Sequence, residues 1–210
     1  MQFAKACTKS AVSERSGIAI MGFNAPEWTM SYMGGIMSNL IATGIYITNE
    51  PEACLYQINH AEAEVVVVET QEHLNKILVN IDKMPQVKVI VMYGEEKLPK
   101  DVKDSRVVLW ADFLKIGQKD VPDEIIYAKM RKQNAGNCTT LIYTSGTTGN
   151  PKGCMISHDN LTWTAKNMML QLYLEKPELM GHDNRIVSYL PLSHIAGLEF
   201  DILLQLCMGH

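Results

Sequence analysis

The sequence lacks the features that would place it in several specialised classes of protein. Its five cysteines are an odd number, are widely spaced, and include no C-x-x-C pair. A structural zinc site or disulfide framework is therefore not indicated, and reduced thiols in a cytosolic protein fit the pattern best. With 8 prolines and 14 glycines in 210 residues, the chain has too few of either to be disordered or collagen-like.

Basic residues are also scarce relative to acidic ones. Nineteen Lys and Arg residues against 23 Asp and Glu residues give a formal net charge of −4, so no nucleic-acid partner is expected. The first twenty residues contain charged side chains and no apolar run, so no secretory signal is expected. Residues 28–49 are uncharged over a bilayer-spanning length, but their polar residues and glycines favour a buried helix followed by a strand.

Short β-branched runs alternate with helical stretches along the chain. This pattern predicts an α/β fold of mostly parallel sheets flanked by helices, and the valines at 65–68 indicate a strand covered on both faces. The expected strands are residues 17–22, 44–47, 64–69, 87–92, 106–110, 139–143 and 185–190. The expected helices are residues 26–41, 51–61, 71–81, 122–133 and 157–174, with a sub-domain seam near 129–137.

One segment carries the strongest chemical signal. Residues 144–149 are all Thr, Ser or Gly, and Pro151, Lys152 and Gly153 follow one residue later. Such a backbone turns tightly and presents N–H and O–H donors to one point, which suits an anion with several oxygens. Lys152 adds a mobile positive charge and favours a polyphosphate. The alternative interpretation is an ordinary surface turn between a strand and the next element.

Two other loops of similar composition do not match. In the P-loop of nucleoside triphosphatases a second glycine follows the first after four residues, but Pro151 occupies that position here. A serine-hydrolase elbow needs Gly-x-Ser-x-Gly, and Tyr143 stands in place of its first glycine.

The same segment resembles the signature of a known family. Residues 143–153 resemble the phosphate-binding signature of the adenylate-forming (AMP-binding) enzymes, which include acyl-CoA synthetases, luciferases and peptide-synthetase adenylation domains. Residues 188–196 are similar to the next motif of the long-chain acyl-CoA synthetases, and residues 22–28 and 44–49 are similar to their bubblegum-type branch. The resemblance extends over nearly the whole chain.

The resemblance implies a two-step ligase reaction with ATP, Mg²⁺ and coenzyme A. A fatty carboxylate attacks the α-phosphate of ATP to give an acyl-adenylate and pyrophosphate, and coenzyme A then displaces AMP to form the thioester. Carried over by position, His194 and Gly197 would border the acyl substrate, His194 by shaping the site and not by proton transfer. The implied ATP contacts are Thr144, Ser145, Gly146, Thr147, Thr148, Gly149, Asn150, Pro151 and Lys152, with the Thr144 hydroxyl also a ligand to magnesium.

The later motifs of that family are not found in these residues, and residues 197–199 depart from the small and amide residues that the resemblance leads us to expect. Residues 1–210 are therefore expected to be a partial adenylation domain without the C-terminal lid domain, and to have little ligase activity alone. Two alternatives stay open: a non-catalytic nucleotide-binding or regulatory module, and adenylation with a different acceptor. A cytoplasmic location with peripheral association at the endoplasmic reticulum is expected, because long acyl chains partition into bilayers.

Overall fold

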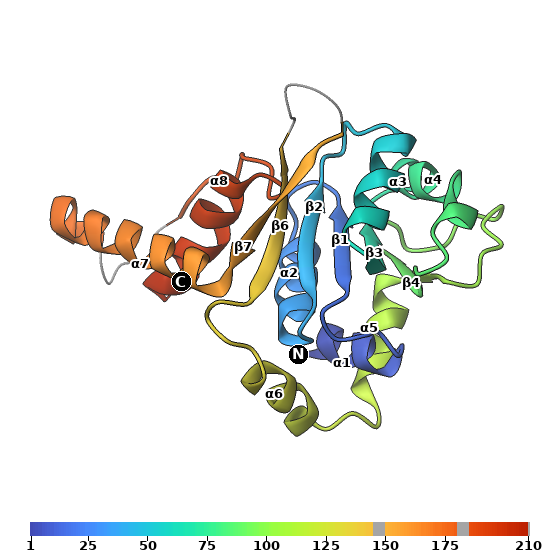
Figure 1. Cartoon of the computed structure of the whole chain (residues 1–210), viewed down its shortest axis with the longest axis horizontal. Helices are drawn as coiled ribbons and strands as arrows, with labels where there is room; N and C mark the ends of the chain where they lie inside the picture. Colours follow the sequence, from blue (N-terminus) through green and yellow to red (C-terminus); the bar gives the residue numbers. More distant parts are fainter. Residues whose placement is uncertain (145–149, 180–184, 210) are drawn as a thin grey trace.

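The computed structural model describes residues 1–144, 150–179 and 185–209. Within them, one seven-stranded sheet runs through the molecule in the order β5-β4-β3-β1-β2-β6-β7 (Figure 1). The strands are β1 (Gly17–Met21), β2 (Ile41–Ile45), β3 (Ala63–Val68), β4 (Val89–Met92), β5 (Val107–Leu109), β6 (Cys138–Thr144) and β7 (Lys152–Ser157). The longer helices are α1 (Gln2–Lys9), α2 (Pro26–Met37), α3 (Pro51–His60), α4 (Gln71–Leu78), α5 (Trp110–Gln118), α6 (Asp123–Arg131) and α7 (His158–Glu175). The short helical segments are η1 (Ile81–Lys83), η2 (Pro177–Leu179), α8 (Ile195–Gly197), the π-helical η3 (Leu198–Leu203) and α9 (Leu204–Met208).

The sheet is mostly parallel, as the sequence predicts. Strands β1 to β6 pair in parallel, and only β7 runs antiparallel, against β6. Because β1 lies between β2 and β3, the chain adds strands first on one side and then on the other, which is the doubly wound arrangement. β6 then joins the sheet beside β2, so the expected seam at 129–137 comprises the last residues of α6 and the chain that leads into a strand of the same sheet.

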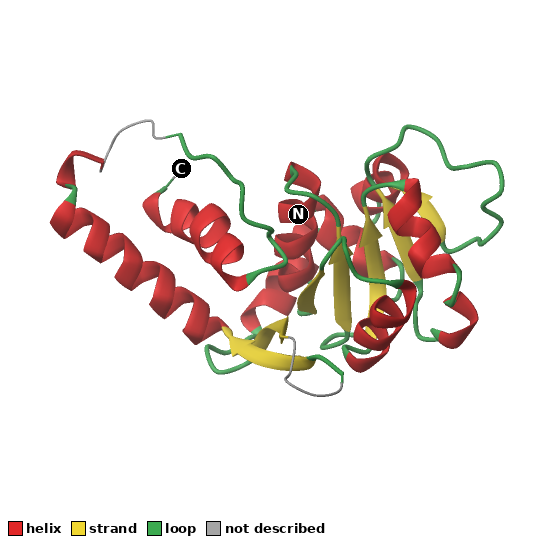
Figure 2. Cartoon of the chain, turned by 90° about the horizontal axis from the view of Figure 1, so that it is seen from above, coloured by secondary structure: helices red, strands yellow, loops and turns green. Residues whose placement is uncertain are grey.

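Helices cover both faces of this sheet (Figures 1 and 2). Side chains of a strand alternate between the two faces, so the apolar side chains divide between two cores. Ile18 and Ile20 belong to the core that includes side chains of α1, α2 and α5. Ala19 and Met21 belong to the core that includes side chains of α3 and α4. A strand with both faces covered has no solvent side, which explains why its apolar run is continuous.

All five expected helices and six of the seven expected strands are present, with shifted ends in several cases. Pro26 and Pro51 begin α2 and α3, where a missing N–H costs little. Ser157 caps α7: its hydroxyl accepts from the N–H of Asn160, and the Asn160 side chain accepts from the N–H of Ser157. Helix α2 ends four residues earlier than expected, before Asn39, whose φ of 64° is incompatible with a continuing right-handed helix.

The expected strand at residues 185–190 is wrong. This segment has no strand partner in the described part of the chain, and Val187 and Tyr189 are 80% and 77% exposed. A β-branched run becomes a strand only where a neighbour supplies hydrogen bonds, and here the Asn24 side chain binds the carbonyl groups of Ser188 and Leu190 instead. The segment therefore crosses the ends of other strands as irregular chain.

Helices α1 and α5 and strand β7 were not predicted. Neither helix has a side-chain cap that would mark its start. The two helices stabilise each other through aromatic contacts, with the Phe3 ring centroid 5.1 Å from that of Phe113 and 5.4 Å from that of Trp110. Gly117 permits the close approach, because a Cβ there would lie 2.2 Å from the Gln2 carbonyl oxygen.

The uncharged stretch at 28–49 divides into most of α2 and all of β2, as the sequence predicts. In the described residues we find no helix with the length and apolar character needed to cross a bilayer.

We expect Phe113→Ala to lower the free energy of unfolding by about 3–5 kcal/mol, because this fully buried ring joins α5 to α1. Chemical denaturation followed by circular dichroism measures the change. Phe23→Ala is the control, since the Phe23 side chain is 65% exposed. Equal losses in the two variants would contradict the packing described here.

Candidate functional site

Three of the sequence-predicted residues meet at the carboxyl ends of β2 and β6. Thr144, Pro151 and His194 line one cleft of about 420 Å³. Its other lining residues are Tyr46, Asn49, Gln57, Ile142, Tyr143 and Ile195. Ligands of open α/β sheets bind outside the carboxyl ends of the strands, so this cleft is the candidate site.

The loop end of the β6–β7 hairpin, which we call the hairpin mouth, supplies the first part of the site. Thr144 and Lys152 are opposite each other in the last pair of the ladder, and both are exposed. The hairpin thus carries a hydroxyl on one strand and an ammonium group on the other. Asn150 is also exposed, whereas the predicted contacts Ser145, Gly146, Thr147, Thr148 and Gly149 lie outside the described residues.

His194 enters from a distant part of the sequence and caps α8. Its Nδ1 accepts a hydrogen bond from the N–H of Ala196 at 3.1 Å, so the proton of the neutral ring lies on Nε2. Gly44 makes this position accessible: a Cβ there would lie 2.5 Å from the Cα of Ser193. Because Gly44 has no side chain, residues 188–194, which we call the His194 segment, can pack directly onto β2.

Asn24, after β1, holds the same segment from another side. Its Oδ1 accepts from the Leu192 N–H at 3.2 Å, while its Nδ2 donates to the Leu190 carbonyl at 2.8 Å and to the Ser188 hydroxyl at 2.7 Å. Asn24 was not among the predicted site residues. The available signal was its position directly after a buried strand, within a motif that resembled the family.

Four polar lining residues were also missed: Tyr46, Asn49, Gln57 and Tyr143. Tyr143 is 5% exposed, and burial, with a smaller contribution from Tyr56, raises its pKa to about 12. Its hydroxyl therefore stays protonated at neutral pH. The signal for Tyr143 was its place at the end of the strand that leads into the Thr/Ser/Gly run.

Gly197 lies behind the site. A Cβ there would be 2.4 Å from the Pro191 carbonyl oxygen, so glycine is needed for the chain to fold back on residues 190–191. Backbone fills the space beside its Cα on that side, and its role beside an acyl chain stays a prediction.

Two other hollows are less suitable. At the switch point between β1 and β3, the Tyr93 hydroxyl occupies the space over Gly22 and donates to the Phe23 carbonyl at 3.3 Å. The Glu69 carboxylate accepts from the Phe23 N–H at 2.7 Å, so the protein's own groups fill this crevice.

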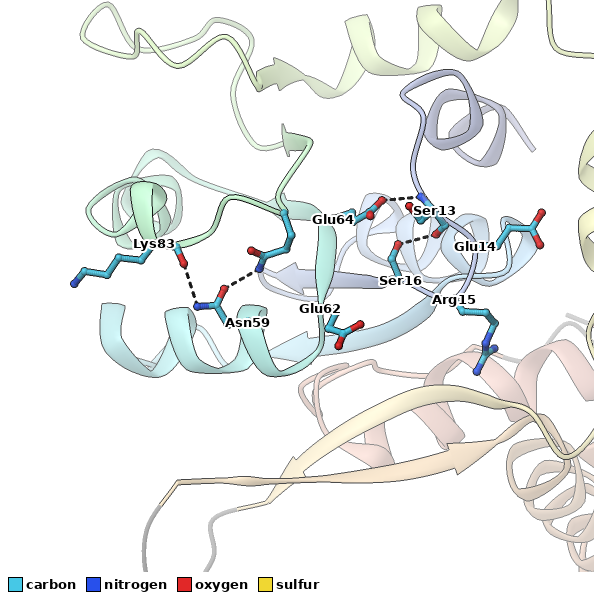
Figure 3. Close-up of a pocket in the computed structure, with 9 residues that line it drawn as sticks. Ser13, Glu14, Arg15, Ser16, Asn59, Glu62, Glu64 and Lys83 are labelled. Carbon is cyan, nitrogen blue, oxygen red and sulfur yellow. Dashed lines mark hydrogen bonds between the residues drawn. The ribbon is translucent and has the colours of Figure 1, made fainter.

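A larger cavity of about 640 Å³ lies at the amino ends of β1 and β3, where Figure 3 shows its lining residues. Glu64 accepts from the N–H of Ser13, and Asn59 bonds both the Lys83 carbonyl and the Gln86 side chain. These bonds engage Glu64 and Asn59 within the protein, and the cavity is at the opposite end of the strands from Thr144.

Glu199 is a buried carboxyl group close to the His194 segment. It is 6% exposed, its Oε2 has no hydrogen-bond partner among the described residues, and burial raises its pKa to about 7. Burial raises the pKa of Tyr32 in α2, and the charge of the nearby Glu199 carboxylate adds a smaller increase. The Tyr32 hydroxyl lies 2.7 Å from that of Thr140 in β6.

The fold and the cleft together define a doubly wound α/β domain whose candidate site lies beside a segment rich in hydroxyl residues and glycine. Solved structures share this fold. The luciferase-like enzyme from the mealworm Zophobas morio superposes with a TM-score of 0.74 at 16% identity, over 99% of this chain and 44% of that one. MatB from Rhodopseudomonas palustris, solved with ATP bound, gives a TM-score of 0.69 at 17% identity, over 98% and 36%.

The chain belongs to the AMP-binding enzyme family, whose sequence model matches residues 1–210. Among curated relatives, the long-chain-fatty-acid–CoA ligase ACSBG2 of Gallus gallus is 42% identical over 98% of this chain. ACSBG1 of Homo sapiens, also a long-chain-fatty-acid–CoA ligase, is 41% identical over 95%. The matched region is 26% and 27% of those proteins, so the chain spans about a quarter of their length.

We expect Gly44→Ala to displace the His194 segment, because the new Cβ would meet the Ser193 backbone and not a flexible side chain. The free energy of unfolding should fall by about 1–3 kcal/mol, as for other overpacked sites. Denaturant titration measures this loss, and Gly136→Ala is the control, since no atom lies within 4 Å of a Cβ at that position. A Gly44→Ala variant as stable as the control would contradict the close approach.

We expect Glu199→Gln to remove part of the pH dependence of stability. The folded-state pKa of about 7 lies above the usual value of 4.5, so the wild type loses stability as pH rises from about 4.5 and the loss levels off above about 7. The total is on the order of 3 kcal/mol. Thermal unfolding between pH 4.5 and 8 measures it, with the exposed Glu124→Gln as control. A Glu199→Gln profile parallel to that of the wild type would contradict the assignment.

Proposed function

We propose that this chain is the nucleotide-binding part of a long-chain fatty acid–CoA ligase, which activates a fatty carboxylate with ATP. The observation that carries the proposal is the meeting of Thr144, Pro151 and His194 in one cleft, with Lys152 at the same hairpin mouth. The relatives named as long-chain-fatty-acid–CoA ligases support the acid–thiol ligase class. The ATP in MatB supports a nucleotide ligand. The anthranilate CoA ligase AuaEII, which has the same fold with a TM-score of 0.66 at 23% identity over 80% of this chain and 30% of that one, was solved with anthranoyl-AMP and supports an acyl-adenylate intermediate.

The hairpin mouth would hold the phosphate tail of ATP. Thr144 offers a hydroxyl and Lys152 a compact positive charge, and we assign residues 145–151 to the same contacts on their sequence alone. Negative charge moves onto the leaving pyrophosphate during adenylation. Donors already in place at that point stabilise the transition state more than the ground state, which lowers the barrier.

His194 would shape the region where the carboxylate meets the nucleotide. Its Nδ1 is engaged by the Ala196 N–H, so the ring presents Nε2–H as a donor and has no free basic nitrogen in this arrangement. This geometry supports a positioning role over proton transfer. We propose that the acyl chain extends from there past Gly197, although Gly197 itself does not line the cleft.

Mg²⁺ would bind at this site together with the nucleotide, through its phosphates. The described residues contain no group of three or more His, Cys, Asp or Glu side chains that could hold a metal ion. Mg²⁺ often keeps several waters and binds through substrate phosphates with few protein ligands, so the single Thr144 hydroxyl is a suitable donor. The ion would neutralise charge on the phosphates.

We propose coenzyme A as the acceptor on the strength of the ligase relatives, in preference to a luciferase-like acceptor. For location we propose the cytoplasm with peripheral association at the endoplasmic reticulum. The support is the affinity of long acyl chains for bilayers.

We expect Lys152→Ala to weaken MgATP binding roughly 10- to 100-fold, the range for a lost charge-assisted hydrogen bond. Isothermal titration calorimetry with the full chain measures the change. Lys166→Ala, which removes an exposed lysine on α7, should bind as the wild type does. Equal affinities for the two variants would contradict the phosphate assignment.

An activity assay separates the competing functions, and it uses a longer chain that includes the lid domain, because residues 1–210 are expected to have little ligase activity alone. ATP-dependent thioester formation by that chain would support the ligase, whereas MgATP binding without it would favour the non-catalytic nucleotide-binding module. A wild-type chain that binds no MgATP would overturn the proposed function.

A further inference from the structure

We infer that Tyr56 and His60 of α3 are positioning residues for the hairpin mouth, an inference that rests on the proposed nucleotide site. The Tyr56 hydroxyl donates to the Pro151 carbonyl at 3.1 Å. The His60 Nδ1 and the Tyr143 hydroxyl are hydrogen-bonded at 2.8 Å. Pro151 directly precedes Lys152, and Tyr143 directly precedes Thr144. One helix therefore holds the chain beside both groups assigned to the phosphates.

Tyr56, His60, Tyr143 and Pro151 form what we call the α3 clasp. Tyr56 and His60 are four residues apart, so they share one face of the helix, and their rings stack with centroids 5.4 Å apart. The Tyr143 ring meets His60 edge to face at 5.7 Å. Each ring thus restricts its neighbour, and the two hydrogen bonds are made from a rigid aromatic unit.

Gly153 completes the contact on the β7 side. A Cβ at this position would lie 3.4 Å from Cε1 of Tyr143 and 3.6 Å from Cε1 of His60, so the backbone passes directly over both rings. The Tyr143 hydroxyl also donates to the Gln57 carbonyl at 3.4 Å. The clasp therefore joins α3, β6 and β7.

The clasp should affect ligand binding in a way that general packing of the core would not. A β-ladder alone fixes the two strands relative to each other, whereas the clasp fixes both strand ends relative to α3 and the cleft. Misplacement of a binding group by about 1 Å is enough to cost much of its effect. Removing a clasp hydrogen bond should therefore weaken binding of a phosphate tail more than it weakens the fold.

The test uses MgATP and tripolyphosphate as probes in calorimetric titrations of the full chain. Tyr56→Phe keeps the stacked ring and removes only the hydroxyl. We expect a three- to tenfold loss of affinity for both probes, with a thermal midpoint close to that of Tyr173→Phe, the control at an exposed tyrosine on α7. Hydrogen exchange at residues 143–144 and 152–153 should become faster in Tyr56→Phe only.

A second pair of variants guards against a purely structural effect. His60→Ala should lose affinity for both probes, and His60→Asn, whose amide can replace Nδ1 as the partner of Tyr143, should recover most of it. If the wild type binds both probes and Tyr56→Phe binds them equally well, the clasp inference is wrong and the proposed function stands. If the wild type binds neither probe, both the proposed function and the inference that rests on it are wrong.

Discussion

The candidate site depends on the docking of β6 against β2. This ladder is short, with two residue pairs, Ala42 with Thr140 and Thr43 with Leu141. Two hydrogen bonds made by buried hydroxyl groups reinforce it: Thr43 donates to the Leu141 carbonyl at 2.9 Å, and Tyr32 pairs with Thr140 at 2.7 Å. Buried hydroxyls are costly unless they are paired, so these bonds define where β6 must lie. Without that docking, the hairpin mouth would not reach the end of β2.

Three further groups then bring distant segments to the same edge. Gly44 leaves space for the Ser193 backbone, Asn24 binds residues 188–192, and the α3 clasp holds the chain on both sides of the hairpin loop. Each acts on a residue beside a candidate contact and not on a ligand. This arrangement fits a phosphate-binding loop, because a loop rich in glycine and small hydroxyl residues has few side chains of its own with which to fix its ends.

Local patterns in the sequence predicted most of the fold. Continuous valines, first-turn prolines and the Ser157 cap are local signals, and each corresponds to an element of the structure. The elements that were missed or wrongly predicted depend on tertiary contacts. Helices α1 and α5 form because Phe3 packs against Phe113, and residues 185–190 stay irregular because no strand in the described residues pairs with them. The loop was visible as composition, but Tyr56, His60 and Asn24 act through neighbours up to 168 positions away, which no local pattern records.

The fold and the family membership limit the function of the chain in different ways. Structures at 16–17% identity share the architecture, so the architecture alone does not select a substrate. Specificity must come from residues in which chains of this fold differ, and residues 197–199 depart from expectation here. Yet Gly197 faces backbone and Glu199 is buried in the same region as Tyr32, and neither lines the cleft. We therefore expect these departures to affect how the chain around Gly197 and Glu199 packs against residues 190–191 and Tyr32, and not the lining of the cleft itself.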